Sequence, residues 1–467
     1  MPREFDAIVI GTGQSGPSLA RRMAGEGWKV AVLERGQPGG TCINTGCIPT
    51  KTLVASAKVA AMVRRAAEYG VVLNDPVRMD MRRVKERMRA VSGKSREVVA
   101  RSLERNENIT FIRGHGSFVG PDAVGVGGEV LRSKRIFINV GARAARPEMP
   151  GVERVPHLDN SSFLALDELP AHLIVVGGSY VGLEFGQMYR RFGSEVTILQ
   201  RGLRLVPRED EDVSTALRGI LEQEGVAVRV GAECTAVEPR GREIVARVSC
   251  AEGAPQVVGT HLLFAVGRVP NTDDLALERA GIETDAQGMI RVDEELRTSV
   301  PGIWALGDCN GRGGFTHTSY NDYEIVEANL FDGGGRKVSE RIPAYALYTD
   351  PPLGRCGMNE REARASGREV LVGKYLMEDV GRAFERSETE GFMKVLVDAR
   401  TKEILGAALL GIEGDEVMHT LLDLMYARAP YTVVTRAMHV HPTVSEYLPS
   451  LFYALEPLAH GAPASDG

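Results

Sequence analysis

The sequence predicts an α/β protein of about three domains, and three observations support this prediction. The chain has 467 residues, whereas a domain averages roughly 150 residues. Hydrophobic residues make up 43% of the chain and charged residues 25%, which is typical of globular proteins and excludes extensive disorder. One pattern of strand, glycine turn, helix and strand occurs twice, at residues 5–34 and 172–200. Repeated units of this kind build parallel sheets that are covered by helices.

The first unit has the glycine spacing of a dinucleotide-binding turn. The apolar run 5–10 is followed by Gly11, Gly13 and Gly16, and a second apolar run ends at Glu34. The first glycine allows the turn, the second lets a pyrophosphate approach the backbone, and the third lets helix and strand pack closely. An acid at the end of the second strand can bind a ribose. The alternative interpretation is a tight strand–helix turn without a ligand.

A pair of cysteines, Cys42 and Cys47, follows this unit. On an ideal helix residues five apart lie ~8–9 Å apart at Cα, whereas a disulfide needs less than ~7 Å. A bridged pair therefore requires irregular backbone, which Gly46 allows. Pro49 then lies near the start of the next helix, whose N-terminus would favour a thiolate at Cys47. A redox-active disulfide, half of a zinc site and two unpaired cysteines remain open interpretations. The other cysteines are predicted to be small buried side chains: Cys234, Cys250, Cys309 and Cys356.

The stretch 82–105 is strongly basic and helical in pattern. A nucleic-acid-binding face is one interpretation, and a long solvated helix is the other. The formal charge of the whole chain is −6, which favours the solvated helix and argues against nucleic acid or an anionic membrane as a partner. Residues 459–467 are predicted to form a frayed tail.

The second unit departs from the glycine pattern at one position. Gly177, Gly178 and Gly182 are present, but Ser179 replaces the second glycine of the motif. A site is still the preferred interpretation, because the strand, turn and helix are all in place. Two dinucleotide sites in one chain indicate a bound flavin together with a diffusing nicotinamide cofactor.

The end of the second unit bears on the choice of nicotinamide cofactor. Gln200 stands where the ribose-binding acid is expected, and Arg201 and Arg204 follow it. Loss of the acid and gain of arginines suits a 2′-phosphate, so NADPH is predicted, with NADH possible. The alternative is that both arginines are simply solvated.

A histidine near the C-terminus has the surroundings of an acid–base group. His441 precedes Pro442, and Glu446 lies five residues after the histidine. The carboxylate can fix one tautomer and raise the imidazole pKa toward neutrality. Thiol–disulfide exchange needs such a base, because only a thiolate attacks. A structural His-Pro pair is the alternative.

Composition gives a prediction of location. We see no signal peptide, and no apolar stretch reaches the ~18 residues of a membrane-spanning helix. The six cysteines are too few for a disulfide-built secreted scaffold. The sequence therefore predicts a cytoplasmic protein without a membrane partner.

Taken together, these motifs resemble the group I flavoprotein disulfide reductases of the pyridine nucleotide–disulfide oxidoreductase family. The resemblance covers essentially the whole chain and rests on a set of motifs: Gly11–Gly16 with Glu34, Cys42–Lys51, Gly177–Glu184, residues 265–271, Gly307-Asp308, and His441-Pro442 with Glu446. Segments 46–53, 207–210, 315–323 and 349–353 look most like the mercuric-reductase-like branch, which includes copper(II)-reducing flavoproteins. No cysteine follows Cys356, so the C-terminal pair with which mercuric reductases hand over the metal is missing.

The resemblance implies roles for individual residues. Cys47 would be the flavin-side sulfur, and Cys42 the interchange sulfur that attacks the substrate. Lys51 would lie near the flavin N5 and pair with Glu184. His441 would come from the partner subunit, with Glu446 behind it. Further cofactor positions are implied: Thr41, Gly116, Gly141, Asp308, Thr316 and His317 toward FAD, and Tyr180 (as the gate of the nicotinamide site), Glu184 and Gly267 toward the nicotinamide dinucleotide.

The resemblance also implies an architecture and an activity. Two Rossmann-like domains, for FAD (1–150 and 271–340) and for NAD(P) (151–270), would precede an α+β dimerisation domain (341–458). Electrons would pass from NAD(P)H through FAD and the Cys42–Cys47 disulfide to a small-molecule or protein disulfide. A copper(II) or mercury(II) reductase, or a dihydrolipoamide dehydrogenase subunit of a multienzyme complex, are the alternatives. A homodimer with a shared active site is expected, and no bound metal.

Overall fold

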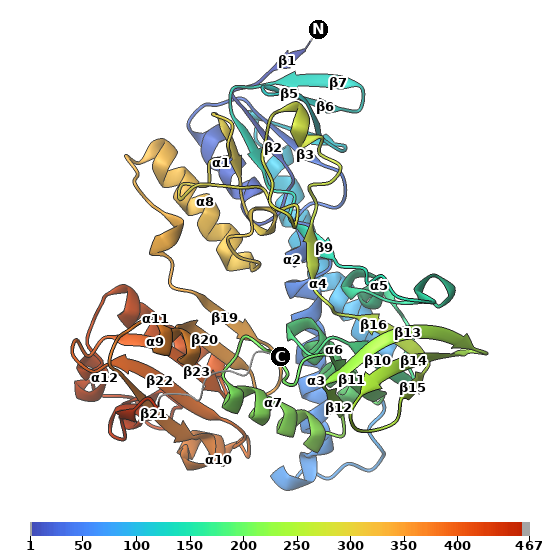
Figure 1. Cartoon of the computed structure of the whole chain (residues 1–467), viewed down its shortest axis with the longest axis vertical. Helices are drawn as coiled ribbons and strands as arrows, with labels where there is room; N and C mark the ends of the chain where they lie inside the picture. The colour runs from blue at the N-terminus through green and yellow to red at the C-terminus, as the bar shows by residue number, and fades with distance from the viewer. Residues whose placement is uncertain (1, 460–467) are drawn as a thin grey trace.

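The computed structural model describes residues 2–459, which fold into three lobes (Figure 1). The lobe that carries the N-terminus contains a five-stranded parallel sheet in the order β18-β8-β2-β3-β4. These strands are β18 (Ile303–Ala305), β8 (Ile136–Ile138), β2 (Ala7–Ile10), β3 (Val30–Glu34) and β4 (Ile109–Arg113). Because β18 pairs with β8, chain segments before and after the second lobe meet in one sheet.

Alternate residues of β2 pack on opposite faces of this sheet. Ala7 and Val9 face a helical layer made of α1 (Gly16–Gly25), α4 (Met81–Glu104) and α8 (Thr316–Phe331). Ile8 and Ile10 face a small sheet of β1 (Arg3–Glu4), β7 (Glu129–Arg132), β6 (Ala123–Val126) and β5 (Ser117–Gly120). Both faces of the strand are therefore buried, which explains its continuous apolar sequence.

The second lobe repeats this plan. Its parallel sheet has the order β12 (Ala227–Val230), β11 (Glu195–Gln200), β10 (His172–Val176) and β16 (His261–Phe264). One face packs on α6 (Tyr180–Phe192) and α7 (Glu211–Gln223), and the other on β13 (Ala232–Arg240), β14 (Glu243–Cys250) and β15 (Gln256–Gly259). The antiparallel pair β9 (Ala142–Ala144) and β17 (Arg268–Pro270) carries the chain into this lobe and back. Both predicted strand–turn–helix–strand units are confirmed.

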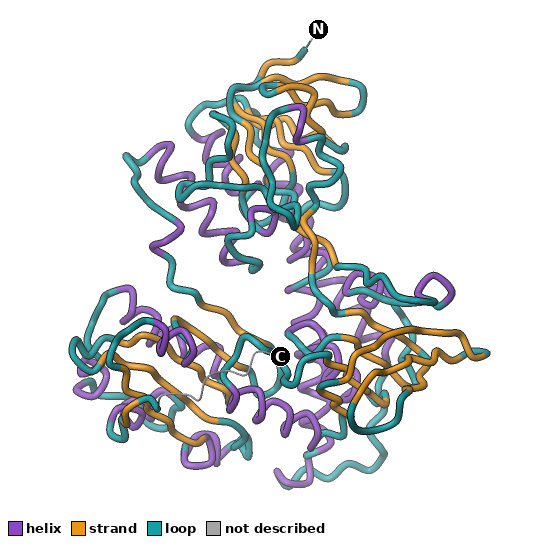
Figure 2. The backbone as a smooth tube through the Cα atoms, viewed as in Figure 1, coloured by secondary structure: helices purple, strands orange, loops and turns teal. Residues whose placement is uncertain are grey.

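The third lobe is an antiparallel sheet with helices. Its strands follow the order β19 (Ala344–Leu347), β20 (Leu353–Gly357), β23 (Ile404–Leu410), β22 (Phe392–Asp398), β21 (Val370–Leu376) and β24 (Glu456–Pro457). Helix α11 (Gly414–Tyr426) contributes Val417, Met418 and Leu421 to its core. Shorter helices complete the lobe: α9 (Glu360–Ala365), α10 (Gly381–Glu385) and α12 (Thr432–Arg436). Figure 2 shows the strands gathered in the three lobes.

The helices between the first two lobes include α3 (Cys47–Arg64) and α4, while α2 (Gly40–Asn44) and α5 (Asn160–Ala165) are short. Single-turn and short 3₁₀ helices are η1 (Ala66–Tyr69), η2 (Val152–Arg154), η3 (Leu277–Arg279), η4 (Asp308–Asn310), η5 (Val338–Glu340), η6 (Met377–Asp379) and η7 (Ser445–Phe452). The predicted domain limits at residues 150, 270, 340 and 458 stay a prediction.

Helix α4 corresponds to the predicted basic helix, with one correction. Arg82 and Arg83 are exposed, but Lys85 is fully buried, and its ammonium donates to the carbonyls of Phe163 and Leu164 at 3.3 and 3.2 Å. Among residues 2–459 no helix is both long and apolar enough to cross a membrane. The predicted tail lies outside the described residues, apart from its first residue at position 459.

Candidate active site

One cleft of about 2140 Å³ contacts both glycine turns and the cysteine segment. It is large beside an ordinary ligand pocket of roughly 300–1,000 Å³. Most of the predicted site residues line it: Gly11, Gly13, Glu34, Thr41, Cys42, Cys47, Lys51, Gly116, Gly141, Gly177, Gly178, Tyr180, Glu184, Gln200, Arg201, Gly267, Asp308, Thr316 and His317. Gly16, Gly182, Arg204, His441 and Glu446 do not line it.

The two glycines outside the cleft have a packing role. A Cβ on Gly16 would lie 2.4 Å from the Gly11 carbonyl oxygen, and one on Gly182 would lie 1.9 Å from the Gly177 carbonyl oxygen. Only glycine lets each helix approach its turn this closely. Gly11 and Gly177 themselves have φ of +100° and +118°, which L side chains rarely adopt. The two units therefore use their first and last glycines in the same way.

Glu34 at the end of β3 lies at the cleft, as predicted. Its carboxylate accepts hydrogen bonds from the backbone N–H groups of Thr12 and Gly36 at 3.0 and 2.7 Å. Asn139, which the sequence did not single out, holds the same turn together. Its side-chain oxygen accepts from the Gly16 N–H at 3.0 Å, and its amide donates to the Leu306 carbonyl at 2.8 Å. The available signal was its position directly after a buried apolar strand.

The cysteine segment has the irregular backbone that the spacing required. Cys42 lies on α2, which ends at Asn44, and Cys47 is the first residue of α3. The Asn44 amide donates to three backbone carbonyls of the preceding turn, and its oxygen accepts from Arg96 at 2.7 Å. Both cysteines are free thiols in this structure.

The pKa values of the two thiols are shifted in opposite directions. A hydrogen bond from Cys42 lowers the pKa of Cys47 to about 6; burial opposes this shift, and a hydrogen bond with Thr316 and the charge of Lys51 support it. The Thr316 hydroxyl lies 3.1 Å from the Cys47 sulfur. The same hydrogen bond with Cys47, together with burial, raises the pKa of Cys42. The reduced pair therefore consists of a thiolate at Cys47 and a neutral thiol at Cys42.

This polarity gives a prediction for the pH dependence of the reduced chain. The Cys47 pKa is lowered, so the thiolate is present above about pH 6 and is lost as the pH falls through this value. We expect the difference in ultraviolet thiolate absorbance between the reduced wild-type chain and Cys47→Ser to show a midpoint near pH 6. A midpoint near the ordinary cysteine value of about 8.5 would contradict it.

Lys51 and Glu184 form an ion pair that joins α3 to α6. The Lys51 ammonium lies 2.9 and 2.7 Å from the two Glu184 oxygens, and 4.7 Å from the centre of the Tyr348 ring. Glu184 also accepts from the Tyr348 N–H at 3.0 Å. The Glu184 side chain is 6% exposed and the Lys51 side chain is 32% exposed, so the cation faces the cleft beside the cysteines.

The loop after β11 places the two predicted arginines differently, and their role in cofactor binding stays a prediction. The Gln200 oxygen accepts from the Gly178 N–H at 2.9 Å, and Arg201 lines the cleft, but Arg204 is exposed outside it. The Val206 N–H donates to the Gly178 carbonyl at 2.8 Å, which holds this loop against the second glycine turn. The same loop brings Arg208, which sequence reasoning missed, to the cleft.

Aromatic rings cluster around Tyr180 at the start of α6, and Tyr180, Phe315 and His317 line the cleft. Tyr180 meets Phe315 and Tyr345 edge-on, with ring centres 6.0 and 5.7 Å apart, and Phe315 is stacked on Tyr345 and on His317. Burial raises the pKa of Tyr180 to about 12, so this phenol stays neutral. Sequence reasoning found Tyr180 and His317 but not Tyr345, which comes from the third lobe.

His441 and Glu446 lie far along the chain, in the third lobe. The His441 Nδ1 is 3.1 Å from both carboxylate oxygens of Glu446, as the spacing predicted. The imidazole is 77% exposed. It does not line the cleft of its own chain.

The cleft fits an FAD and a nicotinamide dinucleotide. Neither α1 nor α6 has a side-chain cap at its first turn, so backbone N–H groups there are available to phosphates. On the first turn Gly11, Gly13 and Glu34 would hold FAD, and Asp308, whose pKa is raised by burial, also lines the cleft. On the second turn Gly177 and Gly178 would hold the nicotinamide dinucleotide.

Family models cover both parts of the chain. Residues 5–322 match the pyridine nucleotide-disulphide oxidoreductase model, and residues 343–451 match the dimerisation domain of the same family. The chain therefore belongs to the pyridine nucleotide–disulfide oxidoreductase family. It is a flavoprotein disulfide reductase that uses FAD and a pyridine nucleotide, and its dimerisation domain indicates a homodimer.

Several individual proteins of this family are similar to the chain over nearly its whole length. The chain is 36% identical to the probable pyridine nucleotide-disulfide oxidoreductase RclA of Escherichia coli, over 96% of this chain and 99% of RclA. It is 32% identical to a dihydrolipoyl dehydrogenase of Cupriavidus necator (96% and 97% covered) and 30% identical to a mercuric reductase of Staphylococcus aureus (93% and 81%). The solved Cu(II) complex of the HOCl-induced flavoprotein disulfide reductase RclA from E. coli superposes with a TM-score of 0.88 at 34% identity, covering 96% and 99%.

Proposed function

We propose that this enzyme passes electrons from NADPH through FAD to the Cys42–Cys47 pair, and from the pair to a disulfide substrate. The observation that carries the proposal is the polarised pair, with the Cys47 pKa lowered and the Cys42 pKa raised, in a cleft that also contacts both glycine turns. When bound, FAD supplies two-electron transfer between nicotinamide and the thiols. The ion pair with Glu184 holds the Lys51 ammonium beside the Cys47 thiolate.

The substrate step requires both sulfurs. Cys42, once deprotonated, attacks one sulfur of the substrate disulfide, which releases the first product thiol and leaves a mixed disulfide on Cys42. Cys47 then attacks the Cys42 sulfur, which releases the second product thiol and forms the Cys42–Cys47 disulfide. Two electrons leave the cysteine pair, and one NADPH restores it.

This step needs a base, because the Cys42 pKa is raised. We assign the base to His441 of the partner subunit, since His441 is exposed and lies outside the cleft of its own chain. The Glu446 carboxylate accepts a hydrogen bond from the Nδ1–H of His441, which leaves Nε2 free to take the Cys42 proton and to return it to the leaving thiolate. The homodimer would thus share each active site between its subunits.

Reduction of a metal ion is the second candidate. The similarity to RclA, which has been solved as a Cu(II) complex, favours copper(II) over mercury(II). The two thiolates can give one electron to each of two copper(II) ions, which forms two copper(I) ions and the Cys42–Cys47 disulfide without protonating a leaving group. A dihydrolipoyl dehydrogenase role stays within the disulfide class, because lipoamide is itself a disulfide. We further propose a cytoplasmic location, since a paired thiol of this kind works in a reducing compartment.

A turnover panel separates these candidates. The purified enzyme is assayed with NADPH or NADH against lipoamide, low-molecular-weight disulfides, quinones, copper(II) and mercury(II). We expect the highest kcat/KM with a disulfide. Turnover with metal ions and with none of the disulfides would contradict the first candidate and support the second.

Substitution of two arginines on the same loop tests the preference for NADPH. Arg201 lines the cleft beside Gln200, whereas Arg204 does not, so Arg204→Ala is a matched control. Charged hydrogen bonds contribute roughly 1.5–3 kcal/mol, and each 1.4 kcal/mol is a factor of ten. Arg201→Ala should therefore lower kcat/KM for NADPH at least about tenfold and spare NADH. A wild-type enzyme that uses both cofactors equally well would contradict the preference.

A further inference from the structure

Arg208 lines the cleft, whereas the two acidic residues that follow it in the chain do not. The chain reads Arg208-Glu209-Asp210, and of these three only Arg208 lines the cleft. Within residues 2–459 its guanidinium makes no ion pair and no hydrogen bond, whereas both neighbouring acids are buried. A cation without a partner, in a cleft that fits two dinucleotides, is suited to bind a phosphate.

Residues of the third lobe bind the side chains of both acids. Asp210 accepts from the Glu360 N–H at 2.9 Å and pairs with Arg355 at 3.1 Å and Lys394 at 2.9 Å. Glu209 accepts from the Tyr345 hydroxyl and lies 3.6 Å from Arg355. The loop backbone is held as well, because the Asn359 amide donates to the Arg208 carbonyl at 3.2 Å.

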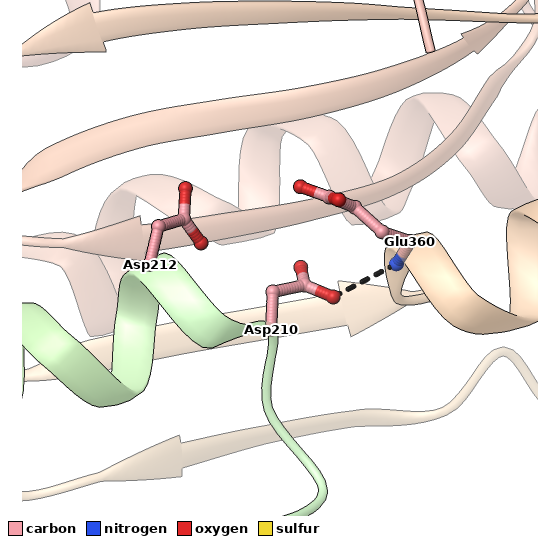
Figure 3. A group of neighbouring side chains, drawn as sticks. All are labelled: Asp210, Asp212 and Glu360. Atoms are coloured by element: carbon pink, nitrogen blue, oxygen red, sulfur yellow. Dashed lines mark hydrogen bonds between the residues drawn. The ribbon is translucent and has the colours of Figure 1, made fainter. Parts of the chain in front are cut away.

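Lys394 is the centre of this arrangement. Figure 3 shows the carboxylates of Asp210, Asp212 and Glu360 turned toward one another. The Lys394 ammonium, on a side chain that is 2% exposed, lies 2.9, 2.7 and 2.7 Å from them. Lys394, together with Arg355 and Lys374, offsets the charge of these carboxylates, and the contacts hold Asp210 outside the cleft.

We propose that Arg208 binds a phosphate group of the nicotinamide dinucleotide, and that Arg355 and Lys394 are positioning residues that keep Glu209 and Asp210 away from it. A free carboxylate beside Arg208 would neutralise the guanidinium and repel the phosphate. The C-terminal lobe would in this way control the affinity of a site on the second lobe. The inference rests on the proposed use of a nicotinamide dinucleotide as electron donor.

The test measures binding of NADP⁺ and NAD⁺ to the oxidised holoenzyme by calorimetry, without an oxidised substrate. Arg208→Ala should raise Kd at least about tenfold, Arg208→Lys should restore part of the affinity, and Arg204→Ala should leave Kd unchanged. A loss with both nucleotides identifies the pyrophosphate, and a loss with NADP⁺ alone identifies the 2′-phosphate. An unchanged Kd for both nucleotides in Arg208→Ala overturns the proposal.

The positioning role has its own variants. Lys394→Met should weaken nucleotide binding because Asp210 loses one of its two cationic partners and its negative charge is less well offset, while kcat at saturating nucleotide stays near the wild-type value. The double variant Lys394→Met/Asp210→Asn removes that charge and should bind more tightly than Lys394→Met. Equally weak binding in the single and the double variant would show that Lys394 is merely structural.

Should Lys394→Met fail to fold, the variants of the exposed Arg208 still test the phosphate contact. Asp210→Asn alone, which removes the acid, should bind the nucleotides at least as tightly as the wild type. If the wild type binds neither nucleotide, the proposed electron donor and this inference fail together; if it binds normally but reduces no disulfide, only the proposed substrate fails.

Discussion

Replacement of Cys42 or Cys47 by serine should each lower disulfide turnover by at least roughly 10³-fold, because removal of an attacking group removes its covalent step. Both variants should still bind FAD, since neither sulfur supports the glycine turn that would hold it. Cys250→Ser is the matched control. Cys250 is half-buried on β14, its sulfur accepts from Arg229 at 3.0 Å, and it does not line the cleft.

The two serine variants should differ in their spectra. Cys42→Ser keeps the Cys47 thiolate, so it should show the long-wavelength absorption of a thiolate next to bound flavin without any reductant. Cys47→Ser should lack this absorption even after two-electron reduction. The structural basis is the hydrogen bond of Cys47 with Thr316 and the charge of Lys51, which both lower the Cys47 pKa and both remain in Cys42→Ser. Identical spectra for the two variants would show that the assignment of the sulfurs is wrong.

Replacement of His441 by alanine should slow the reduction of a disulfide by roughly 10²–10⁴-fold, which is the usual contribution of a general acid–base group. Reduction of the flavin by NADPH should be unaffected, because that step needs no proton from this imidazole. Glu446→Gln should cost less, since an amide oxygen still accepts the Nδ1–H of His441. A metal-ion substrate should be much less impaired, because no leaving thiolate is protonated.

Stopped-flow measurement of each half-reaction separates the outcomes. The expected result for His441→Ala is normal flavin reduction followed by slow oxidation with a disulfide. Slow flavin reduction with normal disulfide turnover would make His441 a structural residue. Mixed dimers of His441→Ala and Cys42→Ser subunits add a direct test of the shared site. Such a dimer retains one complete site only if the base comes from the partner subunit.

The sequence predicted those features that depend on residues close together in the chain. Glycine spacing and apolar runs identified the two nucleotide units, because a strand, a tight turn and a helix are coded locally. The break between Cys42 and Cys47 followed from helix geometry, and the His441–Glu446 contact followed from a spacing of five residues.

Features that depend on distant segments could not be predicted. Asn139 reaches the Gly16 N–H from a strand more than a hundred residues later, and Tyr345 reaches Tyr180 from the third lobe. The sequence alone does not distinguish Arg204 from Arg208, because both are arginines of one loop. Which of them lines the cleft depends on how the loop packs on Gly178. Lys85 is buried within an otherwise solvated basic helix because it binds carbonyls at the end of α5.

We propose that the Cys42–Cys47 pair carries the electrons from flavin to substrate, and a count of free thiols in the two redox states tests this role. The chain has six cysteines, and the four outside the pair remain reduced in this account. Titration of the denatured protein should find four thiols per subunit in the oxidised enzyme and six after anaerobic reduction with NADPH. Six thiols before and after reduction, in an enzyme that still turns over, would contradict the claim.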